Sequence, residues 1–234
     1  MNKVIAIHQP NFFPWMGYFD KIVNSDSFIL LDDVQFPKKN GTWINRVQLF
    51  VSGEGRWVTA AIKRDYHGTL NINEMAFDEK TPWRQKMLKT IEGNYKKASF
   101  YEENIEFITS LINNPESNIA GYNTDNIIAI SKYLGIDTNK FKLSSGFEIN
   151  SFATQRIIDL VKLCEGDIYF CGGGATGYQE DEMYEANGIQ LLYQNYSHPE
   201  YLQRNNGQFT KGLSILDAIM NIGKDESFGL LTKK

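Results

Sequence analysis

The chain has 234 residues, a length that fits one large domain or a domain with an appendage. Its 24 basic and 28 acidic residues give a net charge of −4, which argues against binding nucleic acid or anionic lipid by bulk attraction. Hydrophobic residues at 42% and charged residues at 22% exclude a disordered, coiled-coil or collagen-like chain. The aromatic content of 13% favours a pocket that grips a flat or apolar ligand surface.

We expect a cytoplasmic protein with no membrane partner. Only residues 4–7 are continuously apolar before His8, which is too short for the core of a signal peptide, and no run approaches the ~18 apolar residues of a membrane span. Two cysteines, Cys164 and Cys171, are too few for a disulfide framework and fit a reducing compartment.

The first third of the chain predicts strand, helix, strand and then a hairpin. Residues 4–7 and 28–31 are short apolar runs typical of strands buried on both faces, and residues 17–23 have helical spacing between them. This order predicts a right-handed parallel crossover. Residues 43–62 alternate in polarity around two glycines, which predicts a β-hairpin.

Helices dominate the middle of the chain. Thr81 as N-cap and Pro82 at the first helical position begin one helix, and two more are expected around residues 105–112 and 126–134. Apolar side chains recur every four residues along the first of them: Trp83, Met87, Ile91 and Tyr95.

Helix and strand alternate again toward the C-terminus. Strands are expected at 141–145, 167–171 and 190–194, and helices at 157–164 and 214–220. We therefore predict that residues 1–234 form a single α/β domain with a mostly parallel, Rossmann-like sheet and helices on both faces. The β-hairpin of residues 43–62 and the helices of residues 81–134 would be insertions.

Ligands bind open parallel sheets where the strands end at their carboxyl side. Four predicted strand ends carry polar or small residues: His8 and Gln9; Asp32 and Asp33; Ser144 and Ser145; and Cys171 with Gly172, Gly173 and Gly174. Any one of these is typical of a polar turn, but together they predict one convergent binding site.

Two of these ends suggest specific chemistry. His8 follows a buried strand directly, so it is either a general base on rigid backbone or a histidine hydrogen-bonded in the core. Residues 172–177 form either an anion cradle of backbone N–H groups or simply a sharp turn from strand to helix.

Candidate catalytic residues also occur in the order Cys171, His198, Asp217, as in acyl-transferring thiol enzymes. The glycine turn would stabilise a Cys171 thiolate, and His198 lies in a loop because Pro199 follows it. The alternative for Asp217 is a capping box that begins at Ser214.

The residues that could bind an anion or a metal ion each have a structural alternative. Arg46, with Asn45 beside it, is either a phosphate clamp or an exposed strand charge. Asp32 and Asp33 would hold a magnesium ion with a nucleotide or, alternatively, cap a turn. Only three histidines are present and neither cysteine has a spaced partner, so no metal centre is expected.

Several motifs together carry a family resemblance. They are residues 8–15 (HQPNFFPW), 17–21 (GYFDK), 32–36 (DDVQF) and 213–217 (LSILD), with Trp43, Asn45-Arg46, Ser144-Ser145, His198-Pro199, Tyr201 and Gln203. This pattern resembles the WbqC-like proteins of bacteria nearly from end to end. The resemblance implies a glycine or aminoacyl transferase acting on amino sugars, encoded among surface polysaccharide genes.

Such an enzyme would form an amide on a nucleotide-linked amino sugar, for example in O-antigen biosynthesis. The acyl donor would arrive on a carrier protein or coenzyme A, with no tightly bound cofactor. His8 or His198 would deprotonate the sugar amine, and the glycine turn would hold an oxyanion. The expected substrate contacts are Gln9, Asn11, Asp32, Asp33, Asn45, Arg46, Ser144, Ser145, Gly172, Gly173, Gly174, Tyr178, Tyr201 and Gln203.

Two positions depart from the family pattern: Cys171 stands where serine is expected, and Ala61 stands where proline is expected. The first departure weakens a thiol mechanism for the family as a whole, although serine could serve the same role.

Two other functions stay open. The start of the chain is also similar to that of the adenylyl- and cytidylyltransferases of the His-x-Gly-His type. It has a strand that ends in histidine, a helix led by Gly17 and then Asp26, but Tyr18 replaces the second histidine. The alternatives are thus a nucleotidyltransferase or ligase that uses Asp32 with magnesium, and a non-catalytic protein that binds sugar nucleotides.

Overall fold

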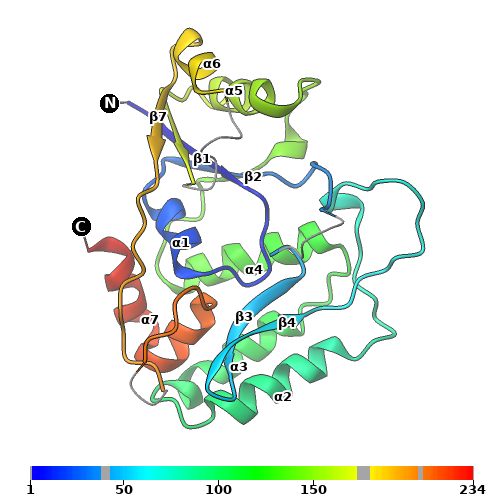
Figure 1. Ribbon diagram of the computed structural model, residues 1–234, viewed down its shortest axis with the longest axis vertical. Helices are drawn as coiled ribbons and strands as arrows, with labels where there is room; N and C mark the ends of the chain where they lie inside the picture. The colour runs from blue at the N-terminus through cyan, green and yellow to red at the C-terminus, as the bar shows by residue number, and fades with distance from the viewer. Residues whose placement is uncertain (1, 38–42, 173–179, 205–207, 234) are drawn as a thin grey trace.

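A five-stranded parallel sheet forms the centre of the protein (Figure 1). The computed structural model describes residues 2–37, 43–172, 180–204 and 208–233. The strands are β1 (Val4–His8), β2 (Ser27–Leu30), β5 (Phe141–Leu143), β6 (Ile168–Cys171) and β7 (Gln190–Tyr193). Their order, β5-β2-β1-β6-β7, is that of a doubly wound sheet, so the predicted Rossmann-like fold is confirmed.

The central strand β1 is buried on both faces. Ile5 and Ile7 belong to one hydrophobic core, together with residues of α5 (Ala153–Leu163) and α6 (Asp181–Ala186), whereas Ala6 belongs to the other core. Successive side chains of a strand point to opposite faces, so a continuously apolar strand needs an apolar layer on each side. Figure 1 shows α5 and α6 on one face of the sheet and α1 on the other.

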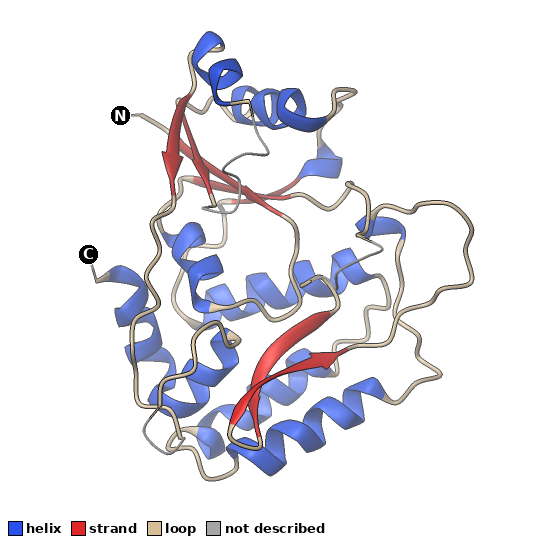
Figure 2. Cartoon of the chain, in the orientation of Figure 1, coloured by secondary structure: helices blue, strands red, loops and turns tan. Residues whose placement is uncertain are grey.

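The larger core joins the second face of the sheet to the remaining elements. The helices on this side are α1 (Met16–Val23), α2 (Trp83–Tyr95), α3 (Tyr101–Ile112), α4 (Ile119–Tyr133) and α7 (Ile215–Thr232). The strands β3 (Arg46–Val51) and β4 (Glu54–Thr59) form a separate antiparallel hairpin next to α2 (Figure 2). The hairpin and α2 to α4 fall within the two predicted insertions, and the assignment of a single domain stays a prediction.

Local sequence signals explain most element boundaries. The hairpin turns at Ser52 and Gly53, whose positive φ angles of 54° and 94° match the twist of the flanking strands. The helix α2 buries the four predicted side chains, but Pro82 rather than Thr81 is its N-cap. The predicted strand at 141–145 ends at Leu143, because the next three residues form a 3₁₀ turn.

The last helix is longer than the sequence pattern predicts. It continues to Thr232 across a break at Gly223, whose φ of 79° is non-helical. A Cβ on this glycine would meet the ring of Phe100 at 2.9 Å, so the break lets α3 and α7 approach closely.

A buried asparagine in α4 fixes the loops on which the candidate site is built. The Asn123 amide donates to Pro10 O and to Ile44 O, both at 2.8 Å. Pro10 belongs to the loop after β1, and Ile44 lies just before the hairpin. This single side chain therefore holds both segments against α4.

We expect Asn123→Ala to lower the free energy of unfolding by about 1–3 kcal/mol, because it removes a hydrogen-bond donor from two carbonyl groups in the interior. Urea denaturation followed by circular dichroism measures this change. Asn150→Ala, at an exposed loop position, is the control and should change stability by less than about 0.5 kcal/mol. Equal losses of unfolding free energy in the two variants would show that the two hydrogen bonds of Asn123 do not stabilise the fold.

Candidate functional site

The four predicted strand ends lie along one edge of the sheet. Ala6 pairs with Phe170, so His8 and Gly172 follow the same edge from neighbouring strands. Asp32 follows β2 and Ser145 follows β5, and all of these strands are parallel. In this strand order, the carboxyl ends of β1 and β6 form the topological switch point, where such sheets bind their ligands.

His8 is held in one tautomer at this switch point. Its Nδ1 lies 3.1 Å from Gln9 O, a carbonyl that also accepts the Tyr18 hydroxyl at 3.0 Å. Because a carbonyl can only accept, Nδ1 carries the proton and Nε2 keeps a lone pair. Burial, and then the positive charge of Lys21, lower the pKa of His8 to about 3. The imidazole is therefore neutral near pH 7.

Lys21 is the residue that the sequence analysis missed. It is only 2% exposed, and its Nζ donates to Ile7 O at 3.0 Å. Burial lowers its pKa to about 8, and the nearby Cys171 raises the pKa in part. No Asp or Glu of the described ranges forms an ion pair with it. A buried ammonium without a carboxylate, beside two strand ends, is a candidate anion site.

Cys171 is fully buried at the end of β6, and its thiol lies 3.5 Å from Leu192 O. A thiol in this environment is not presented to a substrate. Gly172 has open space where a Cβ would stand, as a close approach of ligand to backbone requires. The other predicted members of the anion cradle, Gly173 and Gly174, and the predicted contact Tyr178 lie outside the described residues.

Hydrogen bonds tie the ends of β2 and β5 to each other. The Asp32 carboxylate accepts from Ser144 Oγ (3.0 Å), Ser145 N (3.0 Å) and Ser145 Oγ (2.7 Å). Ser144 Oγ also lies 2.5 Å from Asp33 Oδ1, so its one hydroxyl proton is shared between the two carboxylates, and Asp33 pairs with Arg156 at 2.5 Å. These hydrogen bonds give Asp32, Asp33, Ser144 and Ser145 a structural role, and their contact with a substrate stays a prediction.

The same network argues against a magnesium ion at the two aspartates. Their oxygens already accept from hydroxyl, backbone and guanidinium donors, which a cation would have to displace. Within the described part of the chain, no cluster of three or more His, Cys, Asp or Glu side chains is arranged to hold a metal ion.

An aromatic wall, formed by Trp15, Trp43 and Trp57, leads from His8 to the hairpin. The His8 ring lies 5.9 Å from Trp15, the Trp15 and Trp43 rings are 4.7 Å apart, and Trp43 and Trp57 are 4.6 Å apart. The Arg46 guanidinium lies 4.1 Å from the Trp57 ring centre, a cation–π contact. Trp57 is 37% exposed, so the wall reaches solvent at the hairpin.

Two predicted amide contacts are buried instead. Asn45 donates to Ala60 O at 2.9 Å and so joins the two ends of the hairpin. Asn11 is likewise buried, in the loop that Asn123 holds. The hydrogen bond of Asn45 gives it a structural role in the hairpin, and contact of Asn11 and Asn45 with a substrate stays a prediction.

Asp217 does not orient His198. Its Oδ2 accepts from the Tyr201 hydroxyl at 2.6 Å and from Gln203 Nε2 at 3.1 Å, and the side chain is 1% exposed. Asp217 and His198 therefore do not form the pair on which the predicted Cys171, His198, Asp217 triad depends. Tyr201 and Gln203 hold Asp217 instead, and their contact with a substrate stays a prediction. Burial raises the pKa of Asp217 to about 6, although these hydrogen bonds lower it in part.

The capping box predicted at the start of α7 is also incomplete. Ser214 caps the helix by accepting from Leu216 N at 3.2 Å, but the Asp217 carboxylate turns away to Tyr201 and Gln203.

His198 packs on an aromatic side chain near Gly17. Its ring packs at 5.0 Å on Tyr196, and both Tyr196 and Trp15 come within 3 Å of where a Cβ on Gly17 would stand. Burial, and then the charge of Lys211, lower the pKa of His198. The two histidines are thus connected through aromatic side chains around Gly17.

These features define an α/β protein whose doubly wound sheet carries a histidine, a buried lysine and an aromatic wall at its switch point. The chain matches the model of the WbqC-like protein family over residues 9–227, and it belongs to that family. It is 28% identical over 224 residues to the uncharacterized protein Rv1507c of Mycobacterium tuberculosis (strain ATCC 25618 / H37Rv), and the match covers 95% of each chain. No solved structure matches the chain. None of the helices described here has the length and apolarity to cross a membrane.

Asp217 makes a testable contribution to pH-dependent stability. Its pKa is about 6 in the folded protein against an ordinary 3.8, so the folded state binds the extra proton between these values. This group therefore stabilises the fold least at high pH, and about 2 kcal/mol is lost as pH rises from 4 to 7. Urea denaturation of wild type and Asp217→Asn should show the wild type losing that much relative to the variant across this range.

The matched control is Asp225→Asn, at an exposed position of the same helix. Its stability difference from wild type should stay nearly constant between pH 4 and 7. A constant difference for Asp217→Asn would show that this carboxyl does not titrate abnormally.

Proposed function

We propose that the protein is a transferase that forms an amide on a nucleotide-linked amino sugar in surface polysaccharide biosynthesis. The observation that carries the proposal is the pairing of a neutral His8 with the buried Lys21 at the switch point of the sheet. Proton acceptor and cation are the two groups that attack of an amine on an acyl donor needs. Membership of the WbqC-like family agrees with a transferase.

The proposed reaction uses a thioester on coenzyme A or on a carrier protein. The sugar amine attacks the carbonyl carbon, the new C–N bond forms, and the C–S bond breaks. The amine proton moves to His8 Nε2 and from there to the departing thiolate. An oxyanion forming against Lys21 would cancel the positive charge that helps to depress the His8 pKa, so His8 becomes a stronger base as the reaction proceeds.

Direct attack by the amine is preferred over an acyl intermediate on Cys171. The thiol is fully buried against Leu192 O, and Asp217 and His198 do not form the relay that would activate it. Replacement of Cys171 by serine should therefore leave most of the turnover intact.

The aromatic wall would hold the nucleotide portion of the substrate. Bases and sugar rings stack on indole faces, and Arg46 beside Trp57 would add a positive charge for the diphosphate. A nucleotidyltransferase using Asp32 with magnesium is less well supported, because serine donors already occupy that carboxylate. A non-catalytic binding protein would also bind the sugar nucleotide at the aromatic wall, but its binding would not depend on His8.

Incubation with UDP-glucosamine and acetyl-coenzyme A, used as probes with a free amine and a thioester, tests the activity. Mass spectrometry should detect the N-acylated sugar nucleotide and released thiol. His8→Gln should lower turnover roughly 10²–10⁴-fold, the range for loss of a positioned proton acceptor, with little change in KM. The rate should also fall above about pH 8, as Lys21 loses its proton, and Lys21→Met should remove this dependence.

Cys171→Ser is the matched control at the same edge of the sheet. If it abolishes turnover while His8→Gln retains it, the thiol rather than the imidazole carries the reaction. If no acyl donor gives a product although the probe binds, the protein is a binding module.

Tryptophan fluorescence tests the aromatic wall independently of catalysis. Three of the four tryptophans belong to the wall, so UDP should quench the emission as it stacks. Trp57→Leu should raise the Kd for UDP roughly 5- to 150-fold, from the ~1–3 kcal/mol typical of one stacked base. Trp83→Phe, in the core outside the wall, should leave Kd unchanged. The opposite pattern would place the nucleotide elsewhere.

A further inference from the structure

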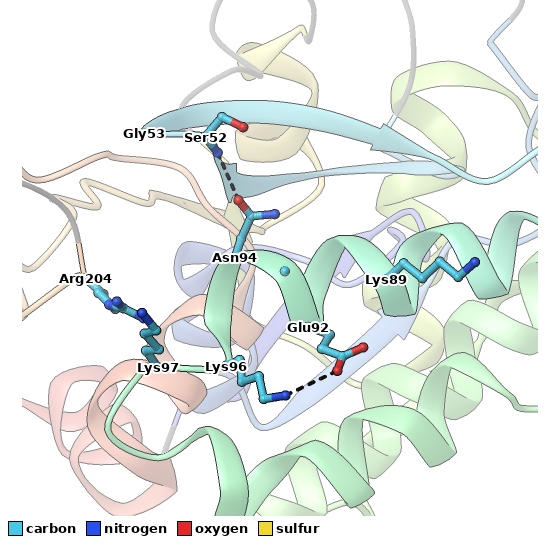
Figure 3. A pocket seen from close by; sticks show the side chains of 9 residues that line it. Ser52, Gly53, Lys89, Glu92, Asn94, Lys96, Lys97 and Arg204 are labelled. Atoms are coloured by element: carbon cyan, nitrogen blue, oxygen red, sulfur yellow. Dashed lines mark hydrogen bonds and ion pairs between the residues drawn. The ribbon is translucent and has the colours of Figure 1, made fainter.

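We propose that a second site, separate from the switch point, binds a small molecule that carries at least two phosphate groups. It is the cavity between the turn of the β3–β4 hairpin and the C-terminal half of α2 (Figure 3). Its volume of about 720 Å³ lies within the range of small-molecule sites. The proposal does not depend on the transferase function.

The charge of this cavity is opposite to that of the chain. Four basic side chains line it, Lys89, Lys96, Lys97 and Arg204, against one carboxylate, Glu92, in a protein of net charge −4. Glu92 pairs with Lys96 at 3.6 Å. Among the residues with described positions, no carboxylate forms an ion pair with the other three cations. The cavity therefore has a local excess of positive charge that an anion would neutralise.

Two of these cations are close to each other. Lys97 and Arg204 line both this cavity and a neighbouring one of about 250 Å³, and Figure 3 shows their side chains side by side. Like charges at short range repel, and an anion bridging them would remove the repulsion. Asn221 also lines the smaller cavity, and its Oδ1 accepts from Arg204 N at 3.1 Å, which holds the backbone of Arg204 in place.

A glycine on α2 gives an independent reason to expect a ligand. Gly93 lines the cavity within the helix, where glycine is less stable than alanine. A Cβ at this position would meet nothing within 4 Å, so packing within the described protein does not require glycine. The close approach of a ligand to the helix backbone would require it.

The spacing of the basic residues fits a phosphate group over Gly93. Lys89 lies one helical turn before Gly93 on α2, whereas Lys96 is the C-cap of the helix and Lys97 follows its end. Asn94 holds the hairpin turn by accepting from Ser52 N at 3.0 Å. A diphosphate over Gly93 would lie between Lys89 on the helix and the cations at its C-terminal end.

The chemistry of the lining favours phosphate groups over a stacked ring. None of the residues that line this cavity in the described structure is aromatic, in contrast to the wall near His8. Recognition would therefore rest on charge, and affinity should fall steeply as salt screens it. Free diphosphate, a nucleoside diphosphate and coenzyme A all share this chemistry.

Isothermal titration calorimetry with inorganic pyrophosphate tests the site in the full chain. Wild type should bind, with at least tenfold weaker affinity at 300 mM than at 50 mM sodium chloride. The double variant Lys97→Gln/Arg204→Gln should raise Kd at least tenfold. Lys63→Gln/Arg64→Gln removes the same charge from an exposed segment and should change Kd less than twofold. No binding at millimolar pyrophosphate, or equal effects of the two double variants, would overturn the proposal.

Gly93→Ala separates ligand binding from folding. It should raise the melting temperature by about 1–4 °C, as expected for alanine in a helix, and yet raise the Kd for pyrophosphate at least fivefold. Gly229→Ala is the matched control in α7, where a Cβ also meets nothing within 4 Å. It should not lower the melting temperature, and Kd should be unchanged. Unchanged binding by Gly93→Ala would refute the role of the glycine.

Variants at both sites show whether pyrophosphate binds at this cavity or at the switch point. The double variant Lys97→Gln/Arg204→Gln is therefore also compared with its parent in an Arg46→Met background, which lacks the cation proposed for the substrate diphosphate at the aromatic wall. Its effect on Kd should persist in that background, and loss of the effect would overturn the proposal. Comparing the Kd values of pyrophosphate, UDP and coenzyme A at this site identifies the molecule that supplies the phosphate groups. Equal affinities indicate that the diphosphate alone is recognised, whereas tighter binding of one ester indicates that ester.

Discussion

The burial of β1 between two hydrophobic cores is the constraint on which the candidate site depends. The strand cannot leave the sheet without exposing apolar side chains on both faces, so its carboxyl end is a rigid point. That end supplies the two groups that define the site: the Ile7 carbonyl, which binds Lys21, and the His8 imidazole. Its pairing with β6 then brings Cys171 beside them from 163 residues away.

The acidic residues of this chain are used mainly to hold the protein together. Asp32 and Asp33 join two strand ends, and Asp217 joins α7 to the segment around Tyr201. Their hydrogen bonds leave them little capacity to bind a cation. Lys21 differs from Arg156, which pairs with Asp33, because Lys21 has no carboxylate partner in the described structure. An acidic protein thus presents cationic and aromatic groups at its concave and strand-end surfaces, which suits anionic ligands.

Periodicity made the fold predictable, whereas contacts between distant segments did not follow from it. Continuous apolar runs indicated strands covered on both faces, and the four-residue repeat from Trp83 indicated α2, since each pattern reports directly on burial. The convergence of His8 and Gly172 followed from parallel topology alone. The partner of Asp217 depended on which loop folds over α7, and the burial of Lys21 was hidden because a lysine reads as a surface residue. The only available signal was its position beside Ile22 on an apolar helix face.

The ionisation states in the site and the core oppose each other in their effect on stability. His8 has its pKa lowered to about 3, so the unfolded chain binds its proton more readily and the fold loses stability as pH falls from about 6.5. Asp217 has its pKa raised to about 6 and acts in the opposite direction over an overlapping range. The free energy of unfolding of the wild type can therefore vary little with pH although it contains two buried groups that burial keeps neutral, because their contributions oppose each other. When one group is removed, the free energy of unfolding follows the pH dependence of the other. The His8→Gln protein should therefore become more stable relative to wild type as pH falls from 6 toward 4.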